Sequence, residues 1–342
     1  MDSTANAGPA SLRIGPLSID NQVILAPMSG VTDIVFRRIA VRLGAGLAVS
    51  EMVASAELAT GDEEARLRAE GDGMNVHSVQ LAGREAKWMA EAARVAEGSG
   101  AQLIDINMGC PVKKVTGGHS GSALLKNLDH ALTLIEATVD AVSVPVTLKT
   151  RLGWDTESIV APELARRAEA AGIRLITIHG RTRQQMYTGT ADWAAIRAVK
   201  DAVSIPVVAN GDLTEFDDAP AMLNESGADA VMIGRGAQGR PWFPGQVARF
   251  LENGERSGEP DLVQQHAIAR EHYDGLLMLY GREVGTRHAR KHLGWYLDEA
   301  SRTSGIEITQ DIRMAVMTAP TPEEAQMALA SAYDSLAWRA AA

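Results

Sequence analysis

Short apolar segments alternate with helical segments along the first two-thirds of the chain. Eight runs rich in Val, Ile and Leu are continuously apolar, and between them apolar residues recur at spacings of three and four. One such helical pattern consists of Trp193, Ile196, Val199 and Val203. The eight runs predict strands at 23–28, 47–52, 75–81, 103–108, 145–150, 175–180, 206–211 and 229–234.

This alternation indicates the fold class. Strands that are apolar throughout, rather than at every second position, are typical of a parallel sheet covered by helices. Eight strand–helix units in strict succession over about 240 residues predict an α/β fold, a (β/α)8 barrel. A doubly wound open sheet is the alternative, and the unbroken series of eight units favours the barrel.

The pattern changes near residue 255, where the strands stop. Four helical segments follow, at 261–280, 286–301, 309–318 and 321–340. The polar segment 252–260 contains Gly and Pro and is typical of a domain boundary. We therefore expect a flexible tail at 1–11, a barrel domain at 12–253 and an all-α helical domain at 260–342.

Composition narrows the classes of protein. Hydrophobic residues make up 46% and charged residues 22% of the 342 residues, which is ordinary for a soluble domain. The formal net charge of −10 argues against coating of nucleic acid or membrane through bulk charge. The single cysteine, Cys110, excludes an intrachain disulfide and a multi-cysteine metal site. Neither a signal peptide nor a membrane span is evident, so we expect a cytoplasmic protein with no metal and no obligate protein partner.

Polar residues stand where six successive predicted strands end. In a barrel, side chains at the carboxyl ends of the strands line the active site. Any one of these residues alone is explained as the partner of a nearby loop, but six in succession indicate a functional site. They are Glu51, Gln80, Asn107, Lys149, His179 and Asn210.

Two glycine-containing segments follow the last two strands and are typical of a phosphate site. Asn210-Gly211-Asp212 and Gly234-Arg235-Gly236 stand where barrels bind phosphate through backbone N–H groups. Gly234, Gly236 and Gly239 also match a dinucleotide-binding spacing. That motif belongs in the first unit of a different fold, so we reject it.

The loop over 107–122 is long and carries the only cysteine. Its glycines and the pair Lys113 and Lys114 are typical of a mobile lid over an anionic substrate. Cys110 lies between Gly109 and Pro111, in a polar loop rather than a core. It can act as a nucleophile, with His119 as the nearby base, or as a proton donor.

Together these segments resemble the motif set of the tRNA-dihydrouridine synthases, and most closely their bacterial B-type branch. The resemblance rests on 26–33, 80–83, 107–111 with 113–115, Lys149, 179–181, 210–212 and 234–236. It implies reduction of the uracil C5=C6 bond in tRNA by an FMN-dependent enzyme, with NADPH as electron donor. Hydride would pass from flavin N5 to C6, and Cys110 would protonate C5 as a general acid, without needing His119.

The resemblance also implies roles for individual residues. Lys149 would lie near flavin N1 and O2, Gln80 would bind the pyrimidine edge of the flavin, and Asn107 would orient the uracil. The residues against the isoalloxazine would be Pro27, Met28 and Ser29. The residues at the ribityl phosphate would be His179, Asn210, Gly211, Asp212, Gly234 and Arg235.

Basic residues supply the expected contacts to tRNA. A short stretch at 282–292 is strongly basic and opposed within that stretch only by Glu283. We expect phosphate contacts there from Arg287, Arg290 and Lys291. Near the site, the expected contacts are Lys113, Lys114, Arg181 and Arg183.

Three other functions remain open on the sequence. They are an FMN barrel acting on a free pyrimidine, an aldolase-type barrel with Lys149 as Schiff base, and a non-catalytic RNA-binding protein. The basic helical stretch disfavours the first. The polar strand ends would be unexplained by the last.

Overall fold

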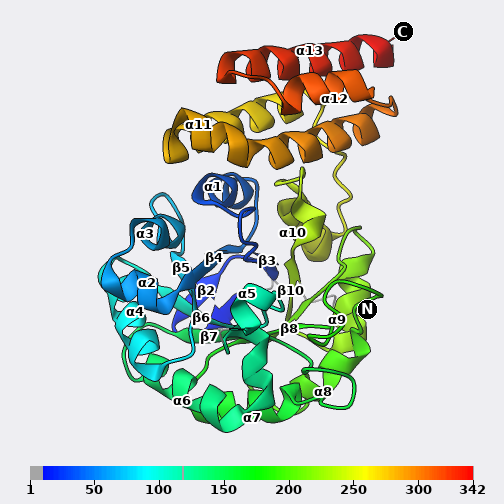
Figure 1. The fold of residues 1–342 in the computed structure, drawn as a ribbon. Coiled ribbons are helices and arrows are strands. Elements are labelled where there is room, and N and C mark those ends of the chain that lie inside the picture. The colour runs from blue at the N-terminus through cyan, green and yellow to red at the C-terminus, as the bar shows by residue number, and fades with distance from the viewer. Residues whose placement is uncertain (1–10, 118, 342) are drawn as a thin grey trace, which may run out of the picture. The chain divides into compact units, whose positions relative to one another are not determined.

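The computed structural model describes residues 11–117 and 119–341, except that the side chains of 114 and 341 are not described. Eight parallel strands close into a barrel in which each strand pairs with the next along the chain and the last pairs with the first (Figure 1). The predicted (β/α)8 barrel is confirmed. The strands are β3 (Val23–Leu25), β4 (Leu47–Ala54), β5 (Ser78–Ala82), β6 (Leu103–Met108), β7 (Val146–Arg151), β8 (Ile176–His179), β9 (Val207–Asn210) and β10 (Ala230–Ile233).

Helices lie outside the barrel and cover the outer faces of the strands (Figure 1). The first of them shows how the sequence starts a helix: the Asp33 carboxylate accepts hydrogen bonds from the N–H groups of Val35 and Phe36, both at 3.0 Å. The helices are α1 (Ile34–Arg42), α2 (Ser55–Thr60), α3 (Glu63–Ala69), α4 (Ala86–Gly98), α6 (Leu128–Val139), α7 (Ala161–Ala170), α8 (Arg197–Lys200), α9 (Asp218–Ser226) and α10 (Phe243–Asn253). Shorter elements fill the loops: α5 (Lys113–Thr116), η1 (Gly121–Lys126), η2 (Ala194–Ile196) and η3 (Arg235–Ala237).

An antiparallel hairpin that the sequence reading missed precedes the barrel. Its strands are β1 (Leu12–Ile14) and β2 (Leu17–Ile19), joined by a turn in which Gly15 has φ 58°. Leu12, Ile14 and Ile19 are buried in one cluster with residues from the amino ends of the barrel strands, such as Leu47 and Leu103. The hairpin therefore packs at the end of the barrel opposite the carboxyl ends of the strands. The expected tail at 1–11 lies outside the described residues except for its last position.

The chain divides into two compact units. One extends through the barrel to Gly236 and resumes at Pro244–Glu255, and the other comprises Ala237–Phe243 and the residues from Arg256 onward. The second unit contains α11 (Leu262–Ser304), α12 (Gln310–Met317) and α13 (Pro322–Ala341). Within it, α11 packs on α13, and the buried Tyr333 of α13 donates from its hydroxyl to the Tyr296 carbonyl of α11 at 3.3 Å.

Helix α11 is two helices in sequence. Gly281 has φ 75° and ψ 167°, a conformation that breaks the helical path and that glycine adopts without strain. The break explains why the hydrophobic pattern predicts separate helices at 261–280 and 286–301, although the second helix begins earlier than expected. Within the described ranges, no helix combines the length and the apolar character that crossing a bilayer requires.

Candidate active site

Strand register brings the polar strand ends together. In the barrel, Asn107 of β6 pairs with Lys149 of β7, and His179 of β8 pairs with Asn210 of β9. Gln80 of β5 pairs with Asp105, two residues before Asn107 on the same face of β6. The site is therefore built from rigid strands, and its loops extend from them.

A hydrogen-bonded network of buried side chains crosses β5, β6 and β7. Asp105 accepts one hydrogen bond from Gln80 Nε2 and one from Thr147 Oγ1, each at 2.7 Å. Gln80 Oε1 in turn accepts from Asn107 Nδ2 at 2.8 Å. Burial raises the pKa of the Asp105 carboxyl, and the two donors oppose that shift. Sequence reading missed Asp105, although its alternation with Asn107 on a predicted strand was a usable signal.

Asn107 also begins the loop that carries the cysteine. Its Oδ1 accepts hydrogen bonds from the N–H groups of Gly109 at 3.1 Å and Cys110 at 3.0 Å. The Cys110 carbonyl accepts from both the N–H and the hydroxyl of Ser122, at 3.1 and 3.0 Å. Gly121 has φ 59°, and a Cβ there would lie 2.7 Å from the Cys110 carbonyl oxygen. The half-buried, free Cys110 is thus fixed through its backbone on both sides.

Arg151, at the end of β7, is a functional candidate that the sequence reading missed. It is 2% exposed, and it donates from Nε to the Gly109 carbonyl at 2.8 Å. It also donates from Nη1 to the carbonyls of Thr182 at 3.0 Å and Met186 at 2.8 Å. Burial lowers its pKa to about 10, so the guanidinium remains charged at neutral pH. Its place two residues after Lys149, on the same face of the strand, was the available signal.

Lys149 directs its ammonium toward the last strands. Its Nζ donates to Asn210 Oδ1 at 2.9 Å, and Asn210 Nδ2 donates to the Met232 carbonyl at 2.8 Å. Burial and the nearby Arg151 charge lower the pKa of Lys149 to about 8, while Asp105 and Cys110 act in the opposite direction. The lysine therefore titrates close to neutral pH in the protein without ligand.

His179 is held neutral in the same region. Burial is the main cause that places its pKa well below the ordinary value, and the positive charges of Lys149 and Arg151 add to the shift. An imidazole at this strand end can therefore serve as a neutral hydrogen-bonding group.

The buried Arg181 and the half-buried Asp212 form an ion pair at the ends of β8 and β9. Arg181 is 1% exposed; it donates from Nη1 to Asp212 Oδ1 at 2.9 Å and from Nη2 to Oδ2 at 2.5 Å. It also donates to the carbonyls of Thr188 at 3.1 Å and Gly189 at 2.5 Å. A side chain this buried and this fully engaged holds the loop in place, and the contact of Arg181 with RNA stays a prediction.

Asp212 organises the loop rather than presenting its charge. Partial burial acts to raise the pKa of this carboxyl, but the Arg181 hydrogen bond and charge outweigh it and hold the pKa below its usual range. Its Oδ2 accepts from the Ala191 N–H at 2.8 Å, and its Oδ1 accepts from Arg235 Nη2 at 3.1 Å. Asp212 adopts φ 59°, a left-handed backbone conformation that is uncommon for residues other than glycine. Any phosphate contact from Asp212 would therefore come from its backbone N–H.

The loop after β3 holds Pro27, Met28 and Ser29. The Met28 N–H donates to Thr32 Oγ1 at 2.9 Å, and the Met28 carbonyl accepts from the N–H of Thr32 at 3.0 Å. The Gly30 N–H donates to the Glu51 carboxylate, whose pKa is raised by burial. Glu51 therefore fixes this turn and does not face open solvent.

The remaining basic candidates divide by exposure. Arg235 and Lys113 are exposed. Arg183 is half-buried, with its guanidinium carbon 4.7 Å from the Trp154 ring centre. Lys114 lies in helix α5, and its side chain is outside the described residues.

The basic stretch of α11 is less uniformly exposed than its sequence predicts. Arg287 and Arg290 are exposed and Lys291 is half-buried. Arg282 is paired with Glu323 of α13, with both carboxylate oxygens at 2.7 Å. His292 is buried. Arg287, Arg290 and Lys291, the three residues predicted to contact RNA, thus keep at least part of their side chains accessible.

Comparison with known proteins assigns the chain to one family. A family model described as dihydrouridine synthase (Dus) matches residues 24–333. A "Probable tRNA-dihydrouridine synthase" of Rhizobium leguminosarum bv. phaseoli is 56% identical over 320 residues, covering 93% of this chain and 97% of that protein. A "tRNA-dihydrouridine synthase B" of Xanthomonas axonopodis pv. citri is 48% identical, covering 94% and 95%.

Among solved structures, histamine dehydrogenase from Rhizobium sp. 4-9 superposes with a TM-score of 0.56 at 16% identity. The match covers 82% of this chain and 50% of the dehydrogenase, so the chain spans about half the length of that enzyme. A likeness at this identity concerns the barrel fold.

Proposed function

Because the chain belongs to the dihydrouridine synthase family, we propose that it reduces a uridine in tRNA to 5,6-dihydrouridine, with bound FMN and with NADPH as electron donor. We further propose that it works in the cytoplasm and needs neither a metal ion nor an obligate protein partner. The observation that carries the proposal is the placement of Cys110, held by Asn107 at the end of β6 beside the ammonium-bearing strand β7.

The chemistry of the strand ends fits a flavin mononucleotide. Lys149 offers a half-buried cation beside the Asn210 amide, which suits a ring edge that gains negative charge on reduction. Gly211 has φ 125°, and a Cβ there would lie 2.6 Å from Ala191 Cβ and 3.1 Å from His179 Cδ2. A side chain at this position would be strained and would clash with Ala191, so the loop that would hold the phosphate requires glycine here.

The proposed flavin ligands follow from this fit. Pro27, Met28 and Ser29 would lie against the ring system, Gln80 at its pyrimidine edge, and Lys149 at N1 and O2. The phosphate would be held by His179, Asn210, Gly211, Asp212 through its backbone, Gly234 and Arg235. When bound, FMN would supply the hydride that C6 of the uracil receives.

The protein's own residues would complete the reduction. Asn107 would orient the uracil, and Cys110 would deliver the proton to C5, leaving a thiolate that regains its proton from solvent. A general acid acts in its protonated form, so the thiol needs no partner base for this task. The substrate uridine must leave its stack to reach a recessed site.

The RNA contacts would come from exposed cations. We propose that Lys113, Lys114 and Arg183 act near the site and that Arg287, Arg290 and Lys291 bind tRNA phosphates. Net charge does not oppose this, because a local cluster governs binding at close range when salt screens distant charges.

A direct experiment tests the proposal. The purified protein should carry a flavin absorption band, be bleached by NADPH, and form dihydrouridine in an unmodified tRNA transcript. Dihydrouridine is detected by nucleoside mass spectrometry. A protein that binds no flavin, or one that is reduced but leaves every tRNA unchanged, would contradict it.

A further inference from the structure

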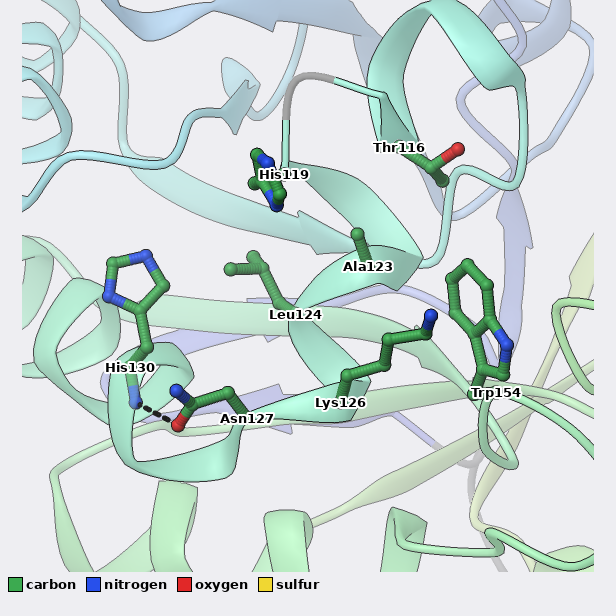
Figure 2. Close-up of a pocket in the computed structure, with 8 residues that line it drawn as sticks. All are labelled: Thr116, His119, Ala123, Leu124, Lys126, Asn127, His130 and Trp154. Atoms are coloured by element: carbon green, nitrogen blue, oxygen red, sulfur yellow. Dashed lines mark hydrogen bonds between the residues drawn. The ribbon is translucent and has the colours of Figure 1, made fainter.

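A cavity of about 420 Å³ lies beside the cysteine loop and has no part in the mechanism above. We call it the His119–Trp154 cavity. Figure 2 shows His119 and His130 on one side of it and Lys126 with Trp154 on the other. It is lined by Thr116, His119, Ala123, Leu124, Lys126, Asn127, His130 and Trp154.

The chemistry of the lining suits a nucleotide with its phosphate. Lys126 Nζ lies 3.7 Å from the Trp154 ring centre. An aromatic face with adjacent cations is the arrangement that binds stacked bases and their backbone in single-stranded nucleic acid. Two imidazoles add N–H donors for phosphate oxygens. None of the eight described lining residues carries a carboxyl group that would repel an anion.

The Lys126 ammonium and the Trp154 ring contact each other, and each can instead contact a part of a bound nucleotide. Lys126 is exposed and long, so its ammonium can turn to a phosphate while a base takes the face of the Trp154 ring. Arg183, 4.7 Å from the same ring centre, contributes a second cation to this aromatic group. On the opposite side, Asn127 Oδ1 accepts from the backbone N–H of His130 at 3.0 Å, which caps the start of α6.

Both walls of the cavity are connected to Cys110. Ala123 and Leu124 belong to η1, whose Gly121 and Ser122 contact the Cys110 carbonyl. Trp154 follows β7, whose Arg151 binds the carbonyl of Gly109. An RNA strand that presents its uracil to Cys110 therefore has its neighbouring nucleotides within reach of the same loop.

We propose that the His119–Trp154 cavity binds a nucleotide of the RNA strand flanking the target uridine, stacking its base on Trp154 and pairing its phosphate with Lys126 and His130. This inference rests on the proposed function and adds a binding subsite to it. The adenosine phosphate of NADPH shares the same chemistry, and the experiment separates the two sources.

The test compares Lys126→Met with a matched control, Lys87→Met. Lys87 is also an exposed lysine over a tryptophan, with Nζ 4.6 Å from the Trp88 ring centre, but on α4. Affinity of each flavin-loaded protein for an unmodified tRNA transcript is measured at several salt concentrations. Lys126→Met should weaken binding about fivefold or more and lower the slope of log K against log salt by about 0.9, as for one lost phosphate contact. Lys87→Met should match the wild type.

A second variant and a second readout complete the design. Trp154→Leu should weaken tRNA binding about tenfold with little change in the salt slope, since it removes stacking and not charge. A tRNA affinity within twofold of wild type for both Lys126→Met and Trp154→Leu would overturn the proposal. If flavin reduction by NADPH slows in those variants while their tRNA affinity holds, the cavity serves the donor and not RNA. Wild-type protein that forms no dihydrouridine at all would refute the proposed function instead.

Discussion

Arg151 Nε donates a hydrogen bond of 2.8 Å to the carbonyl of Gly109, the residue immediately before Cys110. The same guanidinium binds carbonyls in the loop after β8, so one buried side chain joins two loops of the site. Arg151 touches no reacting atom in the proposed reaction, and it acts by positioning the backbone that carries the thiol.

Replacing Arg151 should therefore affect both stability and turnover. Arg151→Met removes the donor that the carbonyls of Gly109, Thr182 and Met186 share, and we expect the free energy of unfolding to fall by about 2–4 kcal/mol. The kcat for dihydrouridine formation should fall more than the flavin affinity. Urea denaturation and single-turnover kinetics measure the two effects. Arg166→Met is the control. Arg166 is exposed and, among the described residues, pairs with Glu163 alone, so its loss should cost less than about 1 kcal/mol.

Cys110→Ala tests the proton donor. It should keep FMN and accept electrons from NADPH at the wild-type rate, yet lose dihydrouridine formation by about 10²-fold or more. Stopped-flow bleaching of the flavin and mass spectrometry of the tRNA give the two readouts. Full turnover by this variant on tRNA would remove the assignment of Cys110 as general acid.

Asp212→Ala should be costly because it strands a buried charge. Arg181 is 1% exposed and loses its only carboxylate partner among the described residues, so we expect a loss of about 3–5 kcal/mol in stability. Arg235→Ala removes the other cation at Asp212, but that side chain is 52% exposed and its loss should cost less than about 1 kcal/mol. Equal costs for the two variants, measured by thermal unfolding, would show that the buried pair has no special weight.

Lys149 makes flavin binding depend on pH. Its pKa in the protein without ligand is about 8, lowered mainly by burial, and an anionic ligand favours the protonated form. Affinity for FMN should therefore be constant below pH 7 and fall by up to about tenfold per pH unit above pH 8. Fluorescence titration of flavin-free protein between pH 6.5 and 9 measures the profile. Lys149→Met should bind weakly with no such fall, and a wild-type profile that stays flat would contradict the assignment.

The same pKa shift predicts how the free energy of unfolding changes with pH. The folded-state pKa of Lys149 lies below its unfolded value. At a pH where the lysine is protonated in both states, this difference lowers the free energy of unfolding. This lowering is complete below pH 8 and is relieved as pH rises from about 8 toward 10.5. Lys149→Met removes it, and the difference in stability between variant and wild type should shrink over that range.

Arg287 and Lys291 test the RNA contacts of the helical unit. Four residues apart on α11, they lie on one face of the helix. Arg287→Ala with Lys291→Ala should weaken tRNA binding, with a salt slope smaller by about 2, and leave flavin reduction by NADPH intact. Arg282→Ala with Glu323→Ala, which removes an existing ion pair, is the control. Unchanged tRNA affinity in the first pair would exclude this surface as an RNA contact.

Local pattern predicted the barrel because each strand is a continuous apolar run followed by an amphipathic helix. The hairpin β1–β2 escaped prediction because each of its strands is only three residues long, too short to show a period. The polar residues of the site are predictable because each stands at the carboxyl end of a predicted strand. Arg181 and Arg183 look alike in sequence, and only the tertiary placement of Asp212 buries the first of them. Asp105 and Arg151 stand two residues from Asn107 and Lys149 on the same strand faces, so alternation along a strand predicts both.

Closure of the barrel delays folding until most of the barrel domain has been synthesised. Val23 of β3 pairs with Val231 of β10, so the ring cannot be completed until residues from opposite ends of the domain meet. Contacts of such long range form slowly. A growing chain or a fragment that ends before β10 exposes two unpaired strand edges, which favours association between chains. Premature termination in this region should therefore yield aggregates rather than a partly active enzyme.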